Sequence, residues 1–497
     1  MKSLLPVFCD VWECFFFVQM KRMLFWLTGP LLFLLAFILL PEISGLNREQ
    51  SAVCGVAFWM ILWWISEIIP MGITALIPVV LFPLLKISDT ADTIANFANP
   101  TLYLFLGGFM LAIGIEKTGL HERIALFIIR LFGKNTNGLI FGFFLATWFI
   151  SMWVSNTATA LMMLPMARSV IVLLKEGFES SSDTNDSRYF ALLIMLGIAY
   201  SANIGGVATL IGTPPNIVMK GYISNLLHTD LSFGKWMLLG VPLSFGLLII
   251  SYYYLTRFRY PISMKEIPGS KLLIESKWDA LGKMSRNERL AAGIFGLTAS
   301  LWISAPSINS LFDTKLLDDT LIAIFGGSLM FTIPVNRHFN KMILSWEDAR
   351  QLPWDILLLF GGGLSLAHGL RETQLMELIG DAFKQMHSSE WVLLAFLTLV
   401  MLLLTEVMSN IALASIFIPV VIGIAESYHY SSLNFAVSVG LASSFAFMLP
   451  ISTPPNAIVY GSGNIPMREM IRSGLVLNLI SVVWILLMVR LLGAYAL

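Results

Sequence analysis

Two short polar segments lie inside apolar runs, and they carry the residues whose types and spacing favour ligand chemistry. Residues 155–160 read SNTATA, and residues 409–414 read SNIALA. Each is followed by a second segment of one kind, IGTPPNIV at 211–218 and ISTPPNAIV at 451–459. Ser, Asn and Thr supply hydroxyl and amide groups, which are costly to place in hydrocarbon unless they are satisfied. These segments therefore indicate a cavity for polar or charged ligands.

The backbone of these segments adds to that chemistry. A Ser-Asn-Thr run at a hairpin tip caps the returning helix and leaves its first N–H groups free. A Thr-Pro-Pro run forces a helix to unwind and restart, because the residue before each proline avoids the helical region. Helix N-termini favour anions, and freed carbonyls favour small cations. The four segments contain no Arg or Lys, so the pattern predicts an anion transporter in which co-bound cations offset the anion's charge.

The composition indicates the environment in which these segments work. Of the 497 residues 57% are hydrophobic and 12% are charged, against roughly 25% charged in soluble domains. The mean hydropathy is +0.79. Apolar runs that are long enough to cross a bilayer recur, as at 24–40, 236–255 and 475–489, and they lack the alternation of a membrane barrel. We expect an all-α polytopic membrane protein. The formal net charge is zero, and we expect no nucleic-acid partner.

An enzyme is the less favoured class. Ser155 and Ser409 have no membrane His within helical reach in the sequence, so neither has a base beside it. Cys9, Cys14 and Cys54 share no metal-ligand spacing. We expect no catalytic residues and no organic cofactor. The acids near apolar spans are interpreted as structural or interfacial: Glu67, Glu116 and Glu406.

The hydropathy pattern predicts about eleven transmembrane helices. Two further stretches, 139–172 and 391–426, are too long for one crossing, and the Ser-Asn motif interrupts each. We interpret them as re-entrant hairpins. That assignment places the basic loop 257–289 in the cytoplasm together with Arg130 and Lys134 beside the first hairpin, as the positive-inside rule requires. It also predicts a cytoplasmic N-terminus and an external C-terminus.

The sequence repeats itself internally. LGGFMLAIGIEKTGL at 106–120 matches FGGGLSLAHGLRETQL at 360–375, and each half then continues with a Ser-Asn hairpin and a TPPN segment. The hairpins enter from opposite sides, so the repeats are inverted, which is a transporter architecture. The predicted organisation is an N-terminal helix (1–50), a first repeat (51–256), a cytoplasmic linker (257–289) and a second repeat (290–497).

These doubled motifs, with about eleven predicted helices and two hairpins, resemble the divalent anion/sodium symporter family of dicarboxylate, citrate and sulfate transporters. The resemblance covers nearly the whole chain. It implies sodium-coupled symport of di- or tricarboxylates of the succinate, malate, fumarate and citrate class. It also implies an elevator-type mechanism in a homodimer, located in the plasma (inner) membrane.

The resemblance implies site residues as well. The first sodium site would use Ser151, Ser155, Asn156 and Gly212. The second would use Thr405, Met408, Asn410 and Ser452. The substrate carboxylates would contact Asn156, Thr157, Thr213, Pro214, Asn410, Thr453 and Pro454.

One position departs from the family pattern. Ile411 stands where the family has Thr after the second Ser-Asn, whereas the first copy keeps Thr157. One hydroxyl donor to a carboxylate is thereby lost. Two alternatives stay open: a sodium-independent carboxylate antiporter, and a sulfate carrier.

Overall fold

The computed structural model describes residues 5–177, 184–314, 316–384 and 388–496, and these residues are predominantly helical. Within these ranges the β-structure amounts to an isolated bridge between Pro334 and Met342. Eight of the described helices are long and apolar enough to cross a membrane, and five shorter apolar helices accompany them. The predicted all-α polytopic membrane fold is therefore confirmed.

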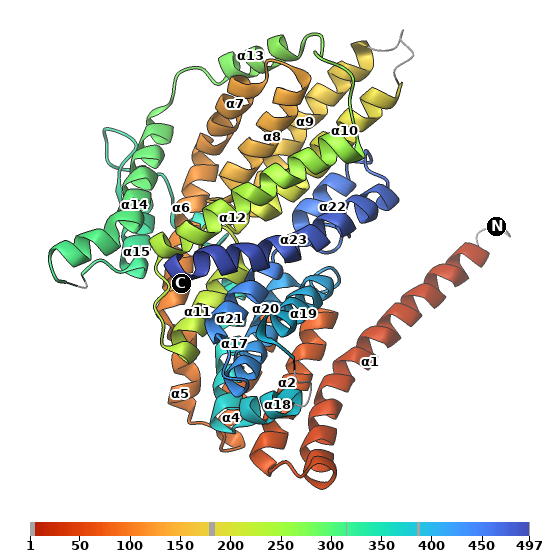
Figure 1. The fold of residues 1–497 in the computed structure, drawn as a ribbon, viewed down its shortest axis with the longest axis vertical. Helices are drawn as coiled ribbons and strands as arrows, with labels where there is room; N and C mark the ends of the chain where they lie inside the picture. Colours follow the sequence, from red (N-terminus) through yellow and green to blue (C-terminus); the bar gives the residue numbers. More distant parts are fainter. Residues whose placement is uncertain (1–4, 178–183, 315, 385–387, 497) are drawn as a thin grey trace. The chain divides into compact units, whose positions relative to one another are not determined.

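The chain forms two compact units (Figure 1). Unit 1 contains residues 1–99, 353–385 and 426–428. Its helices are α1 (Leu5–Ser44), α2 (Arg48–Ser66), α3 (Met71–Thr74), α4 (Ile77–Leu84), α5 (Thr90–Ala95), the 3₁₀ turn η1 (Asn96–Ala98), α17 (Trp354–Glu372) and α18 (Leu375–Lys384).

Unit 2 contains residues 100–352, 386–425 and 429–497. Its first part comprises α6 (Pro100–Thr118), α7 (Leu120–Phe132), α8 (Thr136–Ser151), α9 (Asn156–Gly177), α10 (Thr184–Gly206), α11 (Pro214–Leu227), α12 (Phe233–Tyr253) and the π-helical turn η2 (Tyr254–Arg259). Its later part comprises α13 (Ser270–Ala280), α14 (Arg286–Leu311), α15 (Asp319–Thr332), α16 (Trp346–Ala349), α19 (Glu390–Leu404), α20 (Asn410–Ser427), α21 (Ser432–Ala442), α22 (Pro454–Tyr460) and α23 (Met467–Ala496).

The glycine pairs of the repeated segment serve close helix packing. In unit 2, a Cβ on Gly107 of α6 would lie 2.7 Å from the backbone nitrogen of Ile324 in α15. In unit 1, a Cβ on Gly362 of α17 would lie 2.6 Å from Cβ of Ala75. Side chains at these positions would push the helices apart.

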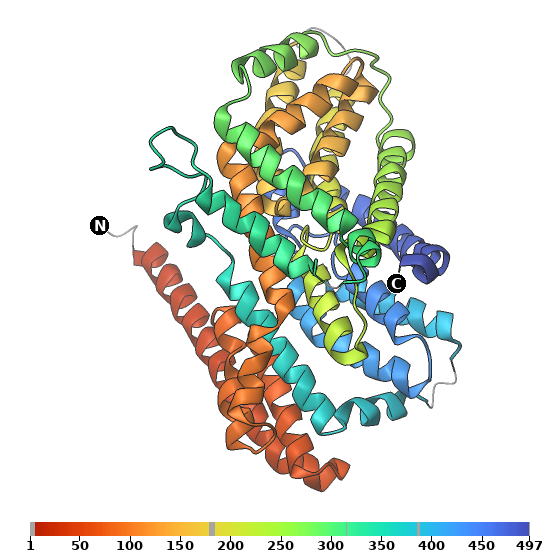
Figure 2. The ribbon, with the colours of Figure 1, turned by 90° about the vertical axis from the view of Figure 1, so that its left-hand side faces the viewer.

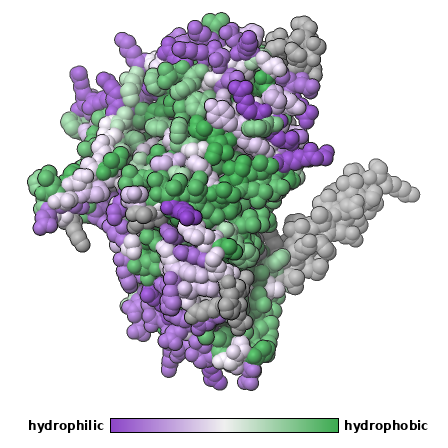
Figure 3. Space-filling view, viewed as in Figure 1, coloured by the Kyte–Doolittle hydropathy of each residue, from purple (hydrophilic) through white to green (hydrophobic). Residues whose placement is uncertain are grey.

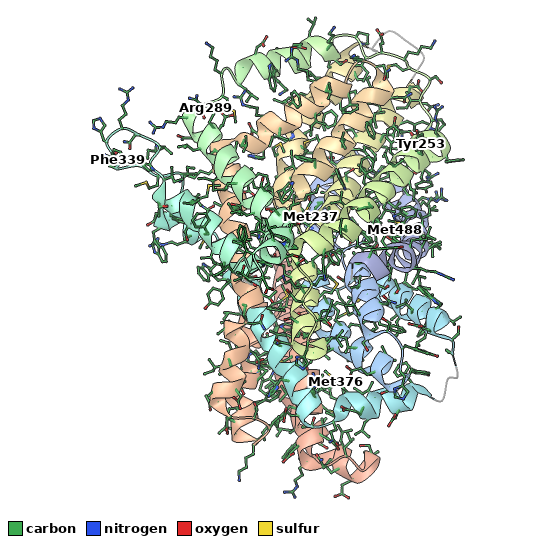
Figure 4. The ribbon with its side chains drawn as sticks, turned by 60° about the vertical axis from the view of Figure 1, so that its left-hand side comes forward. Met237, Tyr253, Arg289, Phe339, Met376 and Met488 are labelled. Carbon is green, nitrogen blue, oxygen red and sulfur yellow. The ribbon has the colours of Figure 1, made fainter. Side chains whose placement is uncertain are left out.

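Within unit 2, α12 and α23 pack against each other, and the Trp484 indole of α23 donates to the Leu243 carbonyl of α12 at 2.8 Å. Figure 2 gives the second view of the helices, and Figure 4 labels Met237 and Tyr253 on α12 and Met488 on α23. Within unit 2, hydrophobic side chains gather over α12 and α23 in Figure 3, and hydrophilic ones gather at the end that carries α13. A band of this kind fits a bilayer.

Candidate functional site

The first Ser-Asn motif lies at a break between two helices. Helix α8 ends at Ser151, and α9 begins at Asn156. The hydroxyl of Ser155, the residue before α9, accepts a hydrogen bond from the Ala158 backbone N–H at 3.2 Å. The Ser151 hydroxyl lies 2.7 Å from Oδ1 of Asn156 and 2.8 Å from the carbonyl oxygen of Ala202 in α10. The break is therefore tied to α10 through a cluster of oxygen atoms.

The second motif repeats this geometry. Helix α19 ends at Leu404, and α20 begins at Asn410. The Thr405 hydroxyl lies 2.7 Å from Oδ1 of Asn410 and 2.7 Å from the carbonyl oxygen of Ser443, just after α21. The match of Asn156 with Asn410 in the sequence thus corresponds to a match in local structure.

Both TPPN segments interrupt their helices as the prolines dictate. Thr213 precedes α11 with φ −144° and ψ 139°, and Thr453 precedes α22 with φ −143° and ψ 149°. These are extended conformations, as expected for a residue before proline. The Thr453 hydroxyl accepts a hydrogen bond from the Asn456 N–H at 3.4 Å, whereas the Thr213 side chain makes no such cap.

The Asn of each TPPN segment holds the preceding loop in place. The Asn216 amide donates to the carbonyls of Gly206 at 3.4 Å and Thr209 at 2.7 Å. The Asn456 amide donates to those of Ala446 at 3.0 Å and Leu449 at 3.1 Å. The partners stand in equivalent positions of the two repeats, so a shared hydrogen-bond pattern shapes both loops.

The residues predicted for the first sodium site lie together. A Cβ on Gly206 would lie 2.6 Å from Oδ1 of Asn156 and 3.1 Å from the carbonyl oxygen of Gly212. This close approach leaves no room for a side chain at position 206. Ser151 and Asn156 are hydrogen-bonded, Gly212 is in the same cluster, and Ser155 is next to Asn156 in the chain.

The residues predicted for the second site are connected through Glu406, a buried acid beside Thr405. Its carboxylate accepts hydrogen bonds from the backbone N–H groups of Phe447, Met448 and Leu449 at 2.8–3.2 Å and from the Asn478 amide at 2.6 Å. Glu406 therefore anchors the loop that leads to Ser452, in agreement with its interpretation as a structural acid.

Ser452 and Met408 have local partners. The Ser452 hydroxyl donates to the Leu449 carbonyl at 2.6 Å and accepts from the Asn456 amide at 3.0 Å. The Met408 backbone N–H donates to the Leu404 carbonyl at 3.1 Å. No described contact joins Ser452 or Met408 directly to Asn410. Thr405 and Asn410 are therefore connected to Ser452 indirectly, through the loop that Glu406 holds.

The two repeats interlock. The Asn203 amide of α10 donates to the Ala446 carbonyl and the Thr453 hydroxyl, both at 3.1 Å. The Tyr222 hydroxyl of α11 donates to the Ser415 carbonyl of α20 at 2.7 Å. Helix α22 packs against α9, and α11 packs against α21. Each TPPN helix is thus held by the other repeat.

Asn203 is a residue that sequence reasoning did not single out. Asn203 lies in the apolar end of α10 and is fully buried, and a buried amide in such a run needs hydrogen-bond partners. That signal is present in the sequence. Its partners are 243 and 250 residues away, and no local pattern points to them.

The site offers oxygen atoms and amide donors. Within the described residues the hydroxyls of Thr157 and Thr213 have no hydrogen-bond partner, which leaves them available to a ligand. Lys220 in α11 is the nearest cation along the chain to Thr213, and its ammonium group lies 2.7 Å from Asp319 in a buried ion pair. Asp319 neutralises that charge.

The tip of each repeat, meaning the residues beside its Ser-Asn and TPPN motifs, differs in exposure between the two repeats. Val407 is 70% exposed and Ile451 is 79% exposed. Their counterparts in the first repeat are less exposed: Ile211 is 9% exposed and packs on Gly108 of α6, and Trp153 is half-buried and packs on rings of α12 and α14. These flanking residues are therefore more exposed in the second repeat than in the first, whereas the Ser-Asn residues of both motifs are half-buried.

Comparison with known proteins agrees with this picture. Residues 21–495 match the family described as the sodium:sulfate symporter transmembrane region. The sodium-dependent dicarboxylate transporter SdcS of Staphylococcus saprophyticus is 37% identical over 467 residues, which cover 93% of this chain and 90% of that protein. SdcS of Staphylococcus aureus strain RF122 is 38% identical over 466 residues, which cover 93% and 89%.

Two solved structures share the fold. The YdaH transporter of Alcanivorax borkumensis matches with a TM-score of 0.57 at 14% identity, over 82% of this chain and 90% of that chain. MtrF of Neisseria gonorrhoeae matches with a TM-score of 0.50 at 14% identity, over 82% and 83%. The family match confirms the resemblance found in the motifs and makes the protein a transporter rather than an enzyme. The chain belongs to the sodium:sulfate symporter transmembrane family.

Proposed function

We propose that this protein is a secondary active transporter that couples the movement of di- or tricarboxylates to sodium. The observation that carries the proposal is the duplicated oxygen cluster, Ser151–Asn156–Ala202 in one repeat and Thr405–Asn410–Ser443 in the other. The names of the SdcS relatives supply the ion and the substrate class.

The donor set suits sodium. Each cluster presents a hydroxyl oxygen, an amide oxygen and a main-chain carbonyl oxygen at a helix break. Hard cations prefer oxygen ligands, and interrupted helices provide them at membrane depth. Two such cations would neutralise a dicarboxylate, which removes the need for a free Arg or Lys in the site.

The carboxylate groups would bind next to these clusters. The N-terminus of α9 supplies backbone N–H groups, and Thr157 and Thr213 add hydroxyl donors. Beside the second cluster, Ile411 places an apolar side chain where Thr157 of the first repeat has a hydroxyl. We infer that the first repeat holds one carboxylate more firmly and that the second tolerates a different end group.

The elevator mechanism, the homodimer and the plasma-membrane location belong to the same proposal. Alternating access needs two tips that open in turn. Val407 and Ile451 are exposed whereas Ile211 is buried. This difference supports a state of the cycle in which the second tip is the more accessible one.

The test is uptake by the purified full-length protein in liposomes. Labelled succinate or citrate should enter faster with an inward sodium gradient than with potassium or choline. Asn156→Ala and Asn410→Ala should each lose sodium-driven uptake. Asn137→Ala is the matched control, because that side chain is exposed and lies near the start of α8.

Three outcomes would change the proposal. Equal uptake in all three salts rejects sodium coupling. Uptake only from vesicles preloaded with a carboxylate indicates the antiporter, and competition by sulfate alone indicates the sulfate carrier.

A further inference from the structure

A groove away from the transport residues lies between α7 and α13 in unit 2, with a volume of about 530 Å³. Phe127, Leu131 and Ile274 form its apolar part. Arg130, Lys134 and Lys271 form a basic rim. In Figure 1, α13 lies beside the end of α7.

The charge of the rim is not balanced. Arg130 is engaged by Glu275, with Nη2 of Arg130 2.8 Å from Oε2 of Glu275. Lys134 and Lys271 are exposed, and neither forms an ion pair within the described residues. The groove therefore presents two free ammonium groups beside an apolar floor.

Aromatic and apolar side chains place this groove at a membrane boundary. The Trp278 ring lies 5.3 Å from the Arg130 guanidinium carbon and 6.3 Å from the Phe127 ring centroid. Phe127 and Leu131 are 54% and 56% exposed. Trp with basic neighbours is typical of the interface between lipid and water. The positive-inside rule assigns Arg130, Lys134 and the loop 257–289 to the cytoplasmic side.

We propose that the groove binds an anionic phospholipid of the cytoplasmic leaflet. The phosphate lies between the ammonium groups of Lys134 and Lys271, and an acyl chain covers Phe127 and Leu131. A soluble phosphate compound would use the rim alone and leave the apolar side chains in water. A lipid satisfies both parts of the groove.

This site would act on the first hairpin. Gly133 and Lys134 lie in the turn between α7 and α8, and α8 ends at Ser151. A lipid bound there fixes the base of the helix that carries the first oxygen cluster.

The test titrates the detergent-purified full-length protein with dioctanoyl phosphatidylglycerol and follows the thermal unfolding midpoint. We expect the midpoint to rise with this lipid and not with dioctanoyl phosphatidylcholine. In Lys134→Gln/Lys271→Gln the lipid concentration for half of the effect should rise roughly 30-fold, from the contribution of two basic residues near an anionic surface. Raising the choline chloride concentration should weaken the effect in the wild type.

Lys277→Gln/Lys283→Gln is the matched control, because it removes the same charge from residues in and just after α13 that do not line the groove. It should behave as the wild type does, and Lys134→Arg/Lys271→Arg should keep the response if the glutamine variant unfolds. Equal loss in the control pair, an equal response to phosphatidylcholine, or full reproduction of the shift by glycerol 3-phosphate would overturn the proposal.

Discussion

Replacing Thr405 by Val removes one hydroxyl and keeps the shape of the side chain. Thr405 is fully buried, and its hydroxyl lies 2.7 Å from both the Asn410 amide oxygen and the Ser443 carbonyl oxygen. In the proposed function this hydroxyl oxygen is a sodium ligand at the centre of the second cluster. The substitution therefore removes a ligand without opening a cavity.

The expected size follows from contacts with charged groups, which contribute about 1.5–3 kcal/mol each. Since about 1.4 kcal/mol is a factor of ten, the sodium concentration for half-maximal uptake should rise roughly 10- to 100-fold. The buried Ser443 carbonyl also loses a donor, so we expect the free energy of unfolding to fall by about 1–3 kcal/mol.

The assay measures the initial rate of uptake of labelled succinate into liposomes at saturating substrate, with choline replacing sodium at constant ionic strength. Thr398→Val is the matched control, because the Thr398 hydroxyl is also buried in α19 but donates to the Leu394 carbonyl of its own helix. A half-maximal sodium concentration within twofold of the wild type, in a folded Thr405→Val protein, would refute the assignment of this ligand.

The remaining predictions concern the second repeat and its difference from the first. Ile411→Thr restores the hydroxyl of the family pattern and should lower the half-saturating succinate concentration several-fold in the uptake assay; an unchanged or higher value would contradict the inferred asymmetry. Glu406→Gln removes the charge that accepts hydrogen bonds from three backbone N–H groups, so the free energy of unfolding should fall by about 2–5 kcal/mol. A thermal unfolding midpoint equal to that of the wild type would show that Glu406 does not anchor its loop. In a cysteine-free background, Val407→Cys should react with a membrane-impermeant maleimide faster than Ile211→Cys, because 70% of Val407 and 9% of Ile211 is exposed; equal rates would contradict the described difference between the tips.

The sequence predicted where the helices break and which break of the first repeat corresponds to which break of the second. Both depend on residues that are close together in the chain. A residue before proline avoids the helical region wherever it stands, so Thr213 and Thr453 had to be extended. A Ser-Asn pair caps a helix through its nearest neighbours, which places the starts of α9 and α20. The composition likewise sufficed for the all-α membrane fold.

The sequence did not reveal which long-range partners complete these breaks. Asn203 reaches the Ala446 carbonyl 243 residues away, and Glu406 reaches Phe447 across a loop and Asn478 in α23. These contacts depend on how whole helices pack, which no short motif encodes. The same holds for the groove between α7 and α13, whose basic residues come from two separate segments.

By itself the sequence determined that two copies of one polar motif interrupt apolar helices, because hydropathy and proline geometry act over a few residues. The sequence also showed that Thr157 and Ile411 differ, but only the tertiary structure decided that the copies differ in burial. Ile211 and Ile451 stand at equivalent positions of the repeat, yet Ile211 packs on Gly108 of α6 whereas Ile451 is exposed. The physical reason is that burial depends on the neighbouring helices, and the two repeats have different neighbours.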